Sequence, residues 1–178
     1  MKKLLLLFGF SLVFLVSCVQ NRSDELTTEQ IAKEKAKVLE VMKAYNLAYQ
    51  KEKFSEIIET LSEDVVFFGT DSTEVIRSLS DFKKMIQAQW EKYDIKYGEM
   101  VDTWILMDNY GTLASMVFGV PAHVKMPDGT EQDVFFRISR TLKKQNQKWV
   151  IASGIVGITQ VMPATAAKPQ TTPPTNAK

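Results

Sequence analysis

The sequence has almost none of the side chains that build disulfides, zinc sites and histidine-based active sites. Its 178 residues include one cysteine, Cys18, and one histidine, His123. A single cysteine can form neither a disulfide nor a thiolate zinc site within the chain. A glycine-rich phosphate loop and a serine-hydrolase elbow are missing too. The sequence therefore contains no motif for a metal ion or a cofactor, and we expect none.

Charge of one sign is also lacking. The chain carries 22 basic and 21 acidic side chains, and the basic residues never form a run. Such a balance gives no electrostatic attraction to nucleic acid, so we expect no nucleic-acid partner. The length suits a single domain, and no internal repeat is present.

The one long apolar run lies at the N-terminus. Lys2 and Lys3 precede apolar residues 4–16, which are too few to cross a bilayer as a helix, since that needs roughly 20 residues. A basic start followed by a short apolar segment is typical of a secretory signal. The alternative to the interpretation below is an ordinary signal that is cut near a cysteine by chance.

The end of this run, Leu15-Val16-Ser17-Cys18, resembles the bacterial lipobox. The resemblance implies cleavage after residue 17 and attachment of acyl chains such as palmitate to Cys18, which would anchor the protein to a membrane. We therefore expect the protein in the bacterial cell envelope. Val19 stands where inner-membrane lipoproteins carry Asp, and this favours the outer membrane.

These features predict four segments. Residues 1–17 are the signal peptide, and residues 18–27 are the lipidated cysteine with a polar tether. Residues 28–162 form the folded domain. Residues 163–178 hold four of the six prolines and too few apolar side chains to fold, so we expect a disordered tail rich in proline and threonine.

The first half of the domain has helical periodicity. Thr27 and Gln30 predict a capping box, and apolar residues then follow at helical spacing. A second, short helix carries Phe54 and Leu61 at its ends, and residues 65–70 form a buried strand. Ser80 is the predicted N-cap of a third helix. The stripe of the first helix comprises Ile31, Val38, Val41, Met42, Tyr45, Ala48 and Tyr49.

From about residue 96 the period changes to two, which predicts strands at 97–107, 112–126, 131–143 and 148–160. Helices followed by a run of strands indicate an α+β fold. Residues 127–129, Pro-Asp-Gly, suit a three-residue hairpin loop. In that register His123 faces Asp133 and Phe118 faces Ile138. A turn at residues 145–146 then aligns Leu142 with Trp149, Arg140 with Ile151 and Phe136 with Ile155. The predicted sheet has one apolar face, made of Met116, Phe118, Val120, Val134, Phe136, Ile138, Trp149, Ile151 and Ile155.

The segment Asp64-Val65-Val66-Phe67-Phe68-Gly69-Thr70-Asp71, followed by Glu74, resembles a run found in SnoaL-like domains related to the association domain of a calmodulin-dependent kinase. Together with three helices and a C-terminal Trp-Val-Ile strand, it makes residues 28–160 similar to the nuclear transport factor two-like superfamily. The resemblance implies three N-terminal helices packed on a strongly curved antiparallel sheet, a cone-shaped, cystatin-like α+β barrel. This fold carries isomerases, dehydratases, cyclases and non-catalytic modules, so function depends on the site.

The resemblance also implies where a catalytic group would lie. In many enzymatic relatives the last strand reads Trp-x-Ile-x-His, whereas here Trp149-Val150-Ile151-Ala152-Ser153 has no His. Three candidates remain for proton transfer: Asp102, His123 and Asp133. His123 and Asp133 form either a catalytic dyad or, as we favour, a cross-strand pair on the surface. Asp102 is either buried beside Trp104, with a raised pKa, or turned to solvent.

Six aromatic residues are candidates for a ligand site at the open end of the cone, although core packing explains such spacing as well. They are Tyr45, Tyr49, Phe67, Trp90, Trp104 and Phe118. Phe135, Arg137, Ser139 and Thr141 fall on the outer face and suit a homodimer interface. Three hypotheses follow: a non-catalytic, membrane-tethered module that binds a small apolar ligand or a protein; an isomerase or dehydratase; and a purely oligomerising module.

Overall fold

A computed structural model describes residues 25–159. The signal peptide, Cys18 and the tail 163–178 lie outside the described residues. The helices are α1 (Thr28–Gln50), α2 (Phe54–Ile58) and α3 (Leu79–Lys92). The strands are β1 (Leu61–Phe68), β2 (Val75–Ile76), β3 (Asp94–Tyr97), β4 (Val101–Met107), β5 (Leu113–Lys125), β6 (Glu131–Gln145) and β7 (Lys148–Thr159). No helix in this part of the chain is long and apolar enough to span a membrane.

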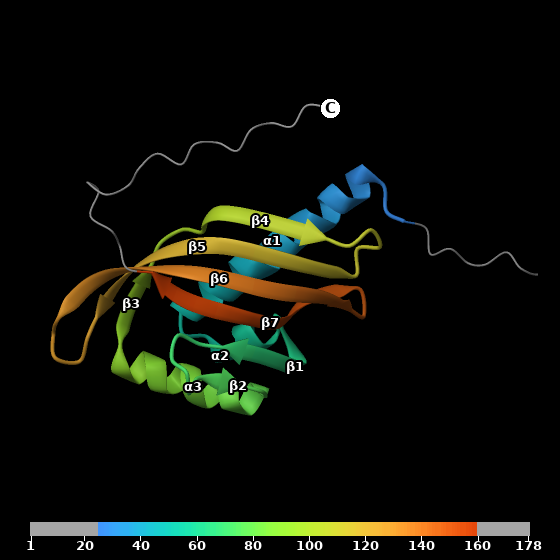
Figure 1. The fold of residues 1–178 in the computed structure, drawn as a ribbon. Coiled ribbons are helices and arrows are strands. Elements are labelled where there is room, and N and C mark those ends of the chain that lie inside the picture. Colours follow the sequence, from blue (N-terminus) through green and yellow to red (C-terminus); the bar gives the residue numbers. More distant parts are fainter. Residues whose placement is uncertain (1–24, 160–178) are drawn as a thin grey trace, which may run out of the picture.

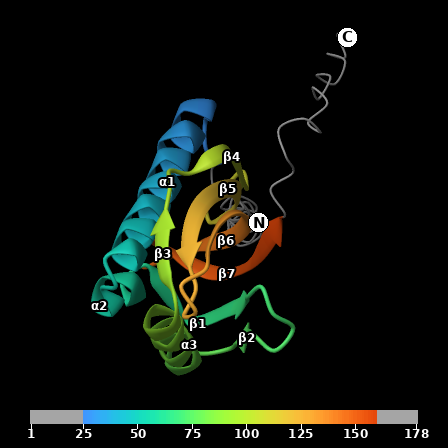
Figure 2. The ribbon, with the colours of Figure 1, turned by 90° about the vertical axis from the view of Figure 1, so that its left-hand side faces the viewer.

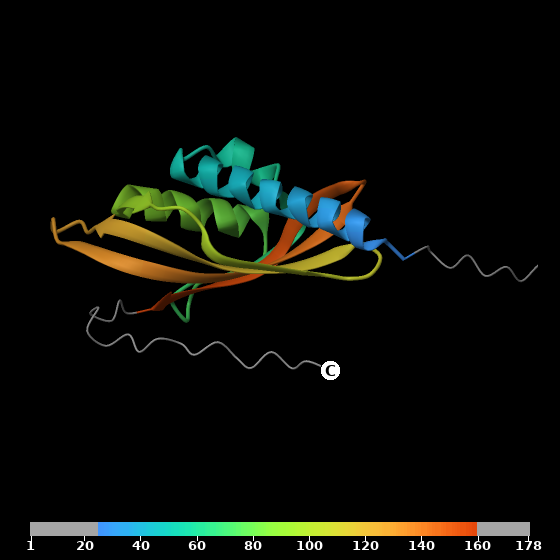
Figure 3. The same cartoon turned by 90° about the horizontal axis from the view of Figure 1, so that it is seen from above.

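The strands form one curled sheet in the order β2-β1-β7-β6-β5-β3, with β4 also paired to β5. The three helices lie on one side of this sheet (Figure 1, Figure 3). The predicted α+β class is confirmed, but the sheet is mixed and not wholly antiparallel, because β1 pairs with β7 in the parallel direction. β1 thus lies beside the last strand of the chain, and the short β2 forms the edge of the sheet.

The helix starts follow local capping chemistry. Thr27 caps α1 in the predicted capping box: its hydroxyl accepts from the backbone N–H of Gln30, and the Gln30 side chain accepts from the N–H of Thr27. The third helix begins earlier than predicted. Ser78, and not Ser80, is its N-cap and accepts from the N–H of Asp81 at 3.0 Å. Both serines precede the same apolar stripe and lie two residues apart, so the sequence did not decide which of them is the N-cap.

The predicted register of β5 and β6 is confirmed. Met126 donates to the carbonyl of Thr130 at 2.7 Å, and Gly129 has a φ of 85°, as a three-residue loop requires. His123 faces Asp133, and Phe118 faces Ile138.

The predicted register of β6 and β7 is wrong. Asn146 and Gln147 both have positive φ and form the two-residue turn, so the turn lies one residue later than predicted. A β-bulge between Thr141 and Leu142 shifts the pairing once more. Leu142 therefore faces Ile151, and Phe136 faces Ile158.

This shift moves Ile155 off the apolar face. Ile155 is 53% exposed on the outer face of the sheet, while its neighbour Val156 packs against the core. A slip of an odd number of residues turns every side chain of a strand to the other face.

The predicted strand 97–107 is two strands. Gly98 donates to the carbonyl of Pro121 at 2.8 Å, and the chain then bends before β4 begins. β3 pairs with the end of β5, and β4 pairs with its first part. The sheet is curled, and α1 and α3 lie on its inner side, so sheet and helices together form a cone (Figure 2).

Candidate functional site

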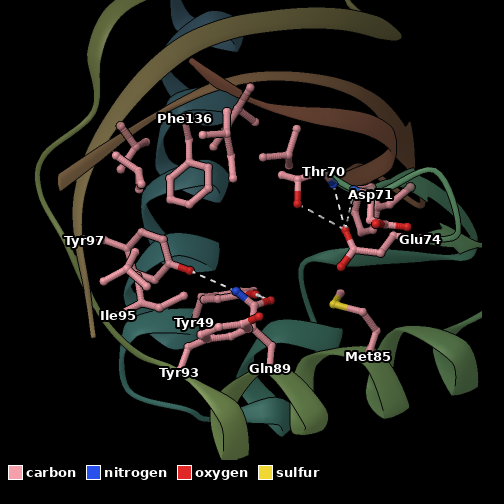
Figure 4. Close-up of a pocket in the computed structure, with 18 of the residues that line it drawn as sticks. Tyr49, Thr70, Asp71, Glu74, Met85, Gln89, Tyr93, Ile95, Tyr97 and Phe136 are labelled. Carbon is pink, nitrogen blue, oxygen red and sulfur yellow. Dashed lines mark hydrogen bonds between the residues drawn. The ribbon is translucent and has the colours of Figure 1, made fainter. Parts of the chain in front are cut away.

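A cavity of about 670 Å³ lies inside the cone. It is enclosed by α1, α3 and the inner face of the sheet, and a small-molecule site is commonly of this size. Figure 4 shows Tyr49, Tyr97, Ile95 and Phe136 on one side and the segment Thr70–Glu74 on the other. Apolar lining residues include Phe67, Ile76, Phe82, Met85, Ile95, Val120, Val124, Val134, Phe136, Ile138 and Val156.

A tyrosine cluster from α1 and β3 forms one wall of the cavity. The Tyr49 hydroxyl donates to Gln89 Oε1 at 2.6 Å, and Gln89 Nε2 donates to the Tyr97 hydroxyl at 3.4 Å. The rings of Tyr49 and Tyr97 meet edge to face with centroids 5.7 Å apart. Burial raises the pKa of Tyr45, Tyr49 and Tyr97 above the ordinary value. At neutral pH these hydroxyls are therefore uncharged hydrogen-bonding groups and poor proton donors.

The cavity opens to solvent at its mouth, past lining residues that are exposed, and these include Thr70, Asp71 and Lys92. Half-buried Glu74 lies beside this mouth, and its Oε2 accepts from the backbone N–H of Thr70 at 2.7 Å and of Asp71 at 3.2 Å (Figure 4). The carboxylate at the mouth is thus held by its own loop, and both signs of charge are present there.

Arg140 is the charged lining residue that is buried. It lies on β6 with only 5% of its surface exposed, and its guanidinium carbon is 4.8 Å from the centroid of the Phe67 ring. Nη1 donates to the carbonyls of Ser139 at 3.0 Å and Ile155 at 3.3 Å. Nε is buried and has no partner among the described residues.

The structure brings three of the six predicted aromatic residues together. Tyr45, Tyr49 and Phe67 line the cavity. Trp90 packs behind it, with its ring centroid 5.9 Å from that of Tyr49. Phe118 is buried in the core but does not line the cavity, because it lies too far along β5 from the mouth.

Trp104, the sixth, lies outside the cone. It is 71% exposed on the outer face of the sheet. A β-bulge between Val101 and Trp104 decides which side chains of β4 point outward, and no local sequence pattern indicates this bulge.

The three candidates for proton transfer also lie outside the cavity. Asp102 is exposed, with a φ of 51° at the bulge of β4, so its burial beside Trp104 is not what the structure has. His123 and Asp133 form the predicted cross-strand pair, with Nδ1 and Oδ1 2.8 Å apart and side chains 44% and 80% exposed. His123 also lies 3.4 Å from Glu131. Hydrogen bonds to Asp133 and Glu131 raise the pKa of His123 above 6.5.

Arg140, Gln89 and Tyr97 were missed by sequence reasoning. Arg140 shares its strand parity with Phe136, Ile138 and Leu142, so a basic residue on an apolar face was the available signal. Gln89 and Tyr97 had no such signal, because their contacts join α3 to β3. No group of His, Cys, Asp and Glu within residues 25–159 is arranged to hold a metal ion.

Comparison with solved structures shows the same fold. A ketosteroid isomerase-like protein from Erwinia carotovora matches 72% of this chain and 98% of its own, with a TM-score of 0.62 and 15% identity. A putative scytalone dehydratase from Novosphingobium aromaticivorans matches 75% and 89%, with a TM-score of 0.64 and 14% identity. A putative calcium/calmodulin-dependent protein kinase II association domain from Xanthomonas campestris matches 68% and 85%, with a TM-score of 0.57 and 16% identity.

At such low identity these likenesses concern the fold and not the activity. A search of curated proteins finds no match. The model of the SnoaL-like domain matches residues 38–155, which run from the middle of α1 into β7 and include most of the cavity lining. The chain belongs to the SnoaL-like domain family.

Proposed function

We propose that this protein is a lipid-anchored, non-catalytic module that binds a small apolar ligand in its cone cavity. The observation that carries the proposal is the cavity of about 670 Å³, lined mainly by aromatic and aliphatic side chains. A hollow of that size and lining favours small apolar molecules, because binding removes apolar surface of both partners from water.

The ionisable groups of the cavity support binding rather than catalysis. A general acid or base works best with a pKa near the operating pH. The buried tyrosines have pKa values raised by burial, and Arg140 stays protonated. Glu74 is held at the mouth by backbone N–H groups. Asp102, His123 and Asp133 lie outside the cavity.

Isothermal titration calorimetry with 2-naphthamide, a neutral aromatic probe, tests this proposal on the full-length chain in a non-ionic detergent, against a detergent blank. We expect saturable binding. Ile138→Trp fills the cavity from β6 and should abolish it, whereas Leu47→Trp adds the same ring to the exposed side of α1 and should leave it unchanged. Near-UV circular dichroism checks that both variants are folded. No binding to the wild type, or equal binding to both variants, would contradict the proposal.

The proposed anchor rests on the lipobox-like segment that ends at Cys18, and we place the protein in the cell envelope, more specifically at the outer membrane. Acyl chains on Cys18 would hold the protein at a membrane, since each buried CH₂ contributes about 0.8 kcal/mol. Wild-type protein should partition into the detergent phase, and Cys18→Ser should not. Unchanged membrane association of Cys18→Ser would rule out the lipid anchor.

We also propose that the outer face of the sheet joins two copies of the chain. A row of facing residues crosses four strands there: Trp104, Val117, Ser139 and Ile155. Its three apolar members are 71%, 44% and 53% exposed. Asp102 and Arg137 border the same shallow hollow, so two copies can place opposite charges together. Light scattering should give a dimer for the wild type and a monomer for Trp104→Glu; a monomeric wild type at micromolar concentration would exclude it.

A further inference from the structure

The interior of the cone holds a positive charge without a negative partner. Arg140 is 5% exposed, and none of the ion pairs within residues 25–159 includes it. The groups that contact its guanidinium are neutral: Nη1 donates to two backbone carbonyls, the Tyr45 hydroxyl interacts with the guanidinium, and Nε has no partner among the described residues. Burying an unpaired charge is costly, and a buried donor without an acceptor adds to that cost.

Arg140 is a charged residue on a face of β6 that is otherwise apolar. Phe136, Ile138 and Leu142 occupy the same face of β6 and are apolar, so a leucine or methionine at position 140 would suit the local packing. Replacing buried charges by apolar residues of similar volume is often neutral or stabilising. Fold stability alone therefore gives no reason for an arginine at this position.

The surroundings of Arg140 define which molecule would satisfy it. Phe67 lies against the guanidinium, and the hydroxyls of Tyr45 and Tyr49 are close enough to interact electrostatically with it. The other charged lining residues, Asp71, Glu74 and Lys92, are exposed or half-buried. A ligand thus meets mixed charge at the mouth, an apolar and aromatic wall beyond it, and one fixed cation inside.

We propose that the cavity binds small carboxylates with an aromatic or other apolar body, and that the carboxylate pairs with Arg140. A guanidinium forms charge-assisted hydrogen bonds with a carboxylate, and these are stronger than hydrogen bonds between neutral groups. The aromatic body then packs against Phe67, Phe136 and Ile138. This inference rests on the proposed function, because it names the ligand class of the same cavity.

A matched pair of probes separates the two proposals. 2-Naphthoate and 2-naphthamide have the same ring system and differ in charge. Calorimetry on the full-length chain should give a dissociation constant for the carboxylate at least about tenfold lower than for the amide, as a buried charged pair provides. Equal affinities would overturn the inference and leave the proposed function intact. Binding of neither probe would contradict the proposed function and the inference with it.

Variants of two arginines assign the preference to a residue. Arg140→Met should raise the dissociation constant of 2-naphthoate about tenfold or more and leave that of 2-naphthamide within about threefold. Arg140→Lys should keep part of the preference, since it keeps the charge but loses the planar guanidinium. Arg77→Met removes an exposed arginine that does not line the cavity and should change neither constant.

A preference for the carboxylate that survives Arg140→Met, or disappears in Arg77→Met, would overturn the inference. Near-UV circular dichroism reports whether each variant is folded. If Arg140→Met fails to fold, the wild-type preference and its reduction in Arg140→Lys decide the question. A folded Arg140→Lys with the full wild-type preference would then count against pairing of the carboxylate with the guanidinium.

Discussion

The contact between α1 and the sheet holds a charged side chain near each of its two ends, and only one of these side chains has partners of opposite charge. Near the start of α1 the Glu34 side chain is only 12% exposed, and its carboxylate lies 2.8 Å from Lys144 Nζ and 2.7 Å from Lys37 Nζ. Trp149 Nε1 donates to it at 2.7 Å. Near the end of α1, Arg140 lies beside Tyr45 with no acid. Lys144 and Arg140 are four residues apart on one strand, so the same sheet carries both arrangements.

The difference separates structural charge from charge available to a ligand. The Glu34 network supplies its own counter-charges and donors, and a network with every member satisfied stabilises the fold. At Arg140 the chain supplies two backbone carbonyls and the uncharged Tyr45 hydroxyl, but no acid. The Glu34 carboxylate already has three donors, whereas Arg140 lines a cavity and lacks a negatively charged partner.

Removing the charge should have opposite consequences at the two ends. Glu34→Ala leaves Lys144 and the Trp149 N–H without an acceptor and should lower the free energy of unfolding by about 3 kcal/mol. Arg140→Met should change it by less than about 1 kcal/mol, or raise it. Urea denaturation of the purified chain measures both. A larger loss in Arg140→Met than in Glu34→Ala would mean that Arg140 is structural.

The close contact beneath Arg140 provides the second comparison. A Cβ added to Gly154 would lie 2.5 Å from both the Ser139 carbonyl oxygen and Arg140 Nη1. Gly154→Ala should therefore lower the free energy of unfolding by about 2 kcal/mol, since backbone must move. At Gly157, on the same strand, the nearest atom would be 3.9 Å away. Gly157→Ala is the matched control and should stay within about 0.5 kcal/mol in the same urea experiment.

Acid should act on the Glu34 end. Burial alone raises the pKa of Glu34, but hydrogen bonds from Lys144, Lys37 and Trp149 outweigh it and lower the pKa to about 2. In the unfolded chain this carboxyl titrates near 4.5. Its contribution to stability is therefore complete above pH 4.5 and is lost as the pH falls toward 2. Unfolding free energies measured between pH 6 and pH 3 should fall less steeply in Glu34→Gln.

Some acid sensitivity should remain in that variant. Hydrogen bonds from Lys143 and Ser62 lower the pKa of exposed Asp64 to about 2 as well. Asp64→Asn is thus the matched control on an exposed carboxyl, and we expect a weaker effect from it than from Glu34→Gln. An equal effect of the two variants would contradict the distinction between the enclosed network and the surface pair.

The smallest effect is expected at His123, whose acid partners are exposed. Because its folded-state pKa is raised above 6.5, its contribution to stability is present below pH 6.5 and is lost as the pH rises through the folded value. His123 is the only histidine, so NMR titration of its ring is unambiguous. Asp133→Asn should bring the pKa down toward 6.5, with little change in unfolding free energy. An unchanged pKa would show that the pair does not form in solution.

Local patterns predicted the parts of the fold that local interactions determine. The Thr27–Gln30 capping box and the Pro127-Asp128-Gly129 loop were both predicted from residues within a few positions of one another, and the loop set the β5–β6 register. The prediction of the β6–β7 register is wrong because two local features both shift the pairing: the turn lies one residue later, and a bulge occurs at Thr141. Composition did not indicate either one.

The candidate site was predicted in part. Periodicity pointed Tyr45, Tyr49 and Phe67 toward the interior, where they line the cavity. It could not separate cavity wall from core, so Phe118 and Trp90 were included. Whether the side chains of Asp102 and Trp104 point inward or outward depends on a bulge in β4. Arg140 occupies the same face of β6 as its apolar neighbours, and this position could have identified it. An argument about register that considers only hydrophobic residues does not use this observation.

The sequence by itself determined the α+β class, the N-cap of α1, the central hairpin and the lipobox-like start. Each of these depends on residues close together in the chain. Tertiary structure alone decided that β1 lies parallel to β7, that the cone is hollow, and that Arg140 is buried without an acid. The physical reason is that a cavity and an unpaired buried charge both depend on groups that are far apart in sequence. Tyr45, Phe67 and Arg140 belong to three different elements, and only the folded, curled sheet brings them together.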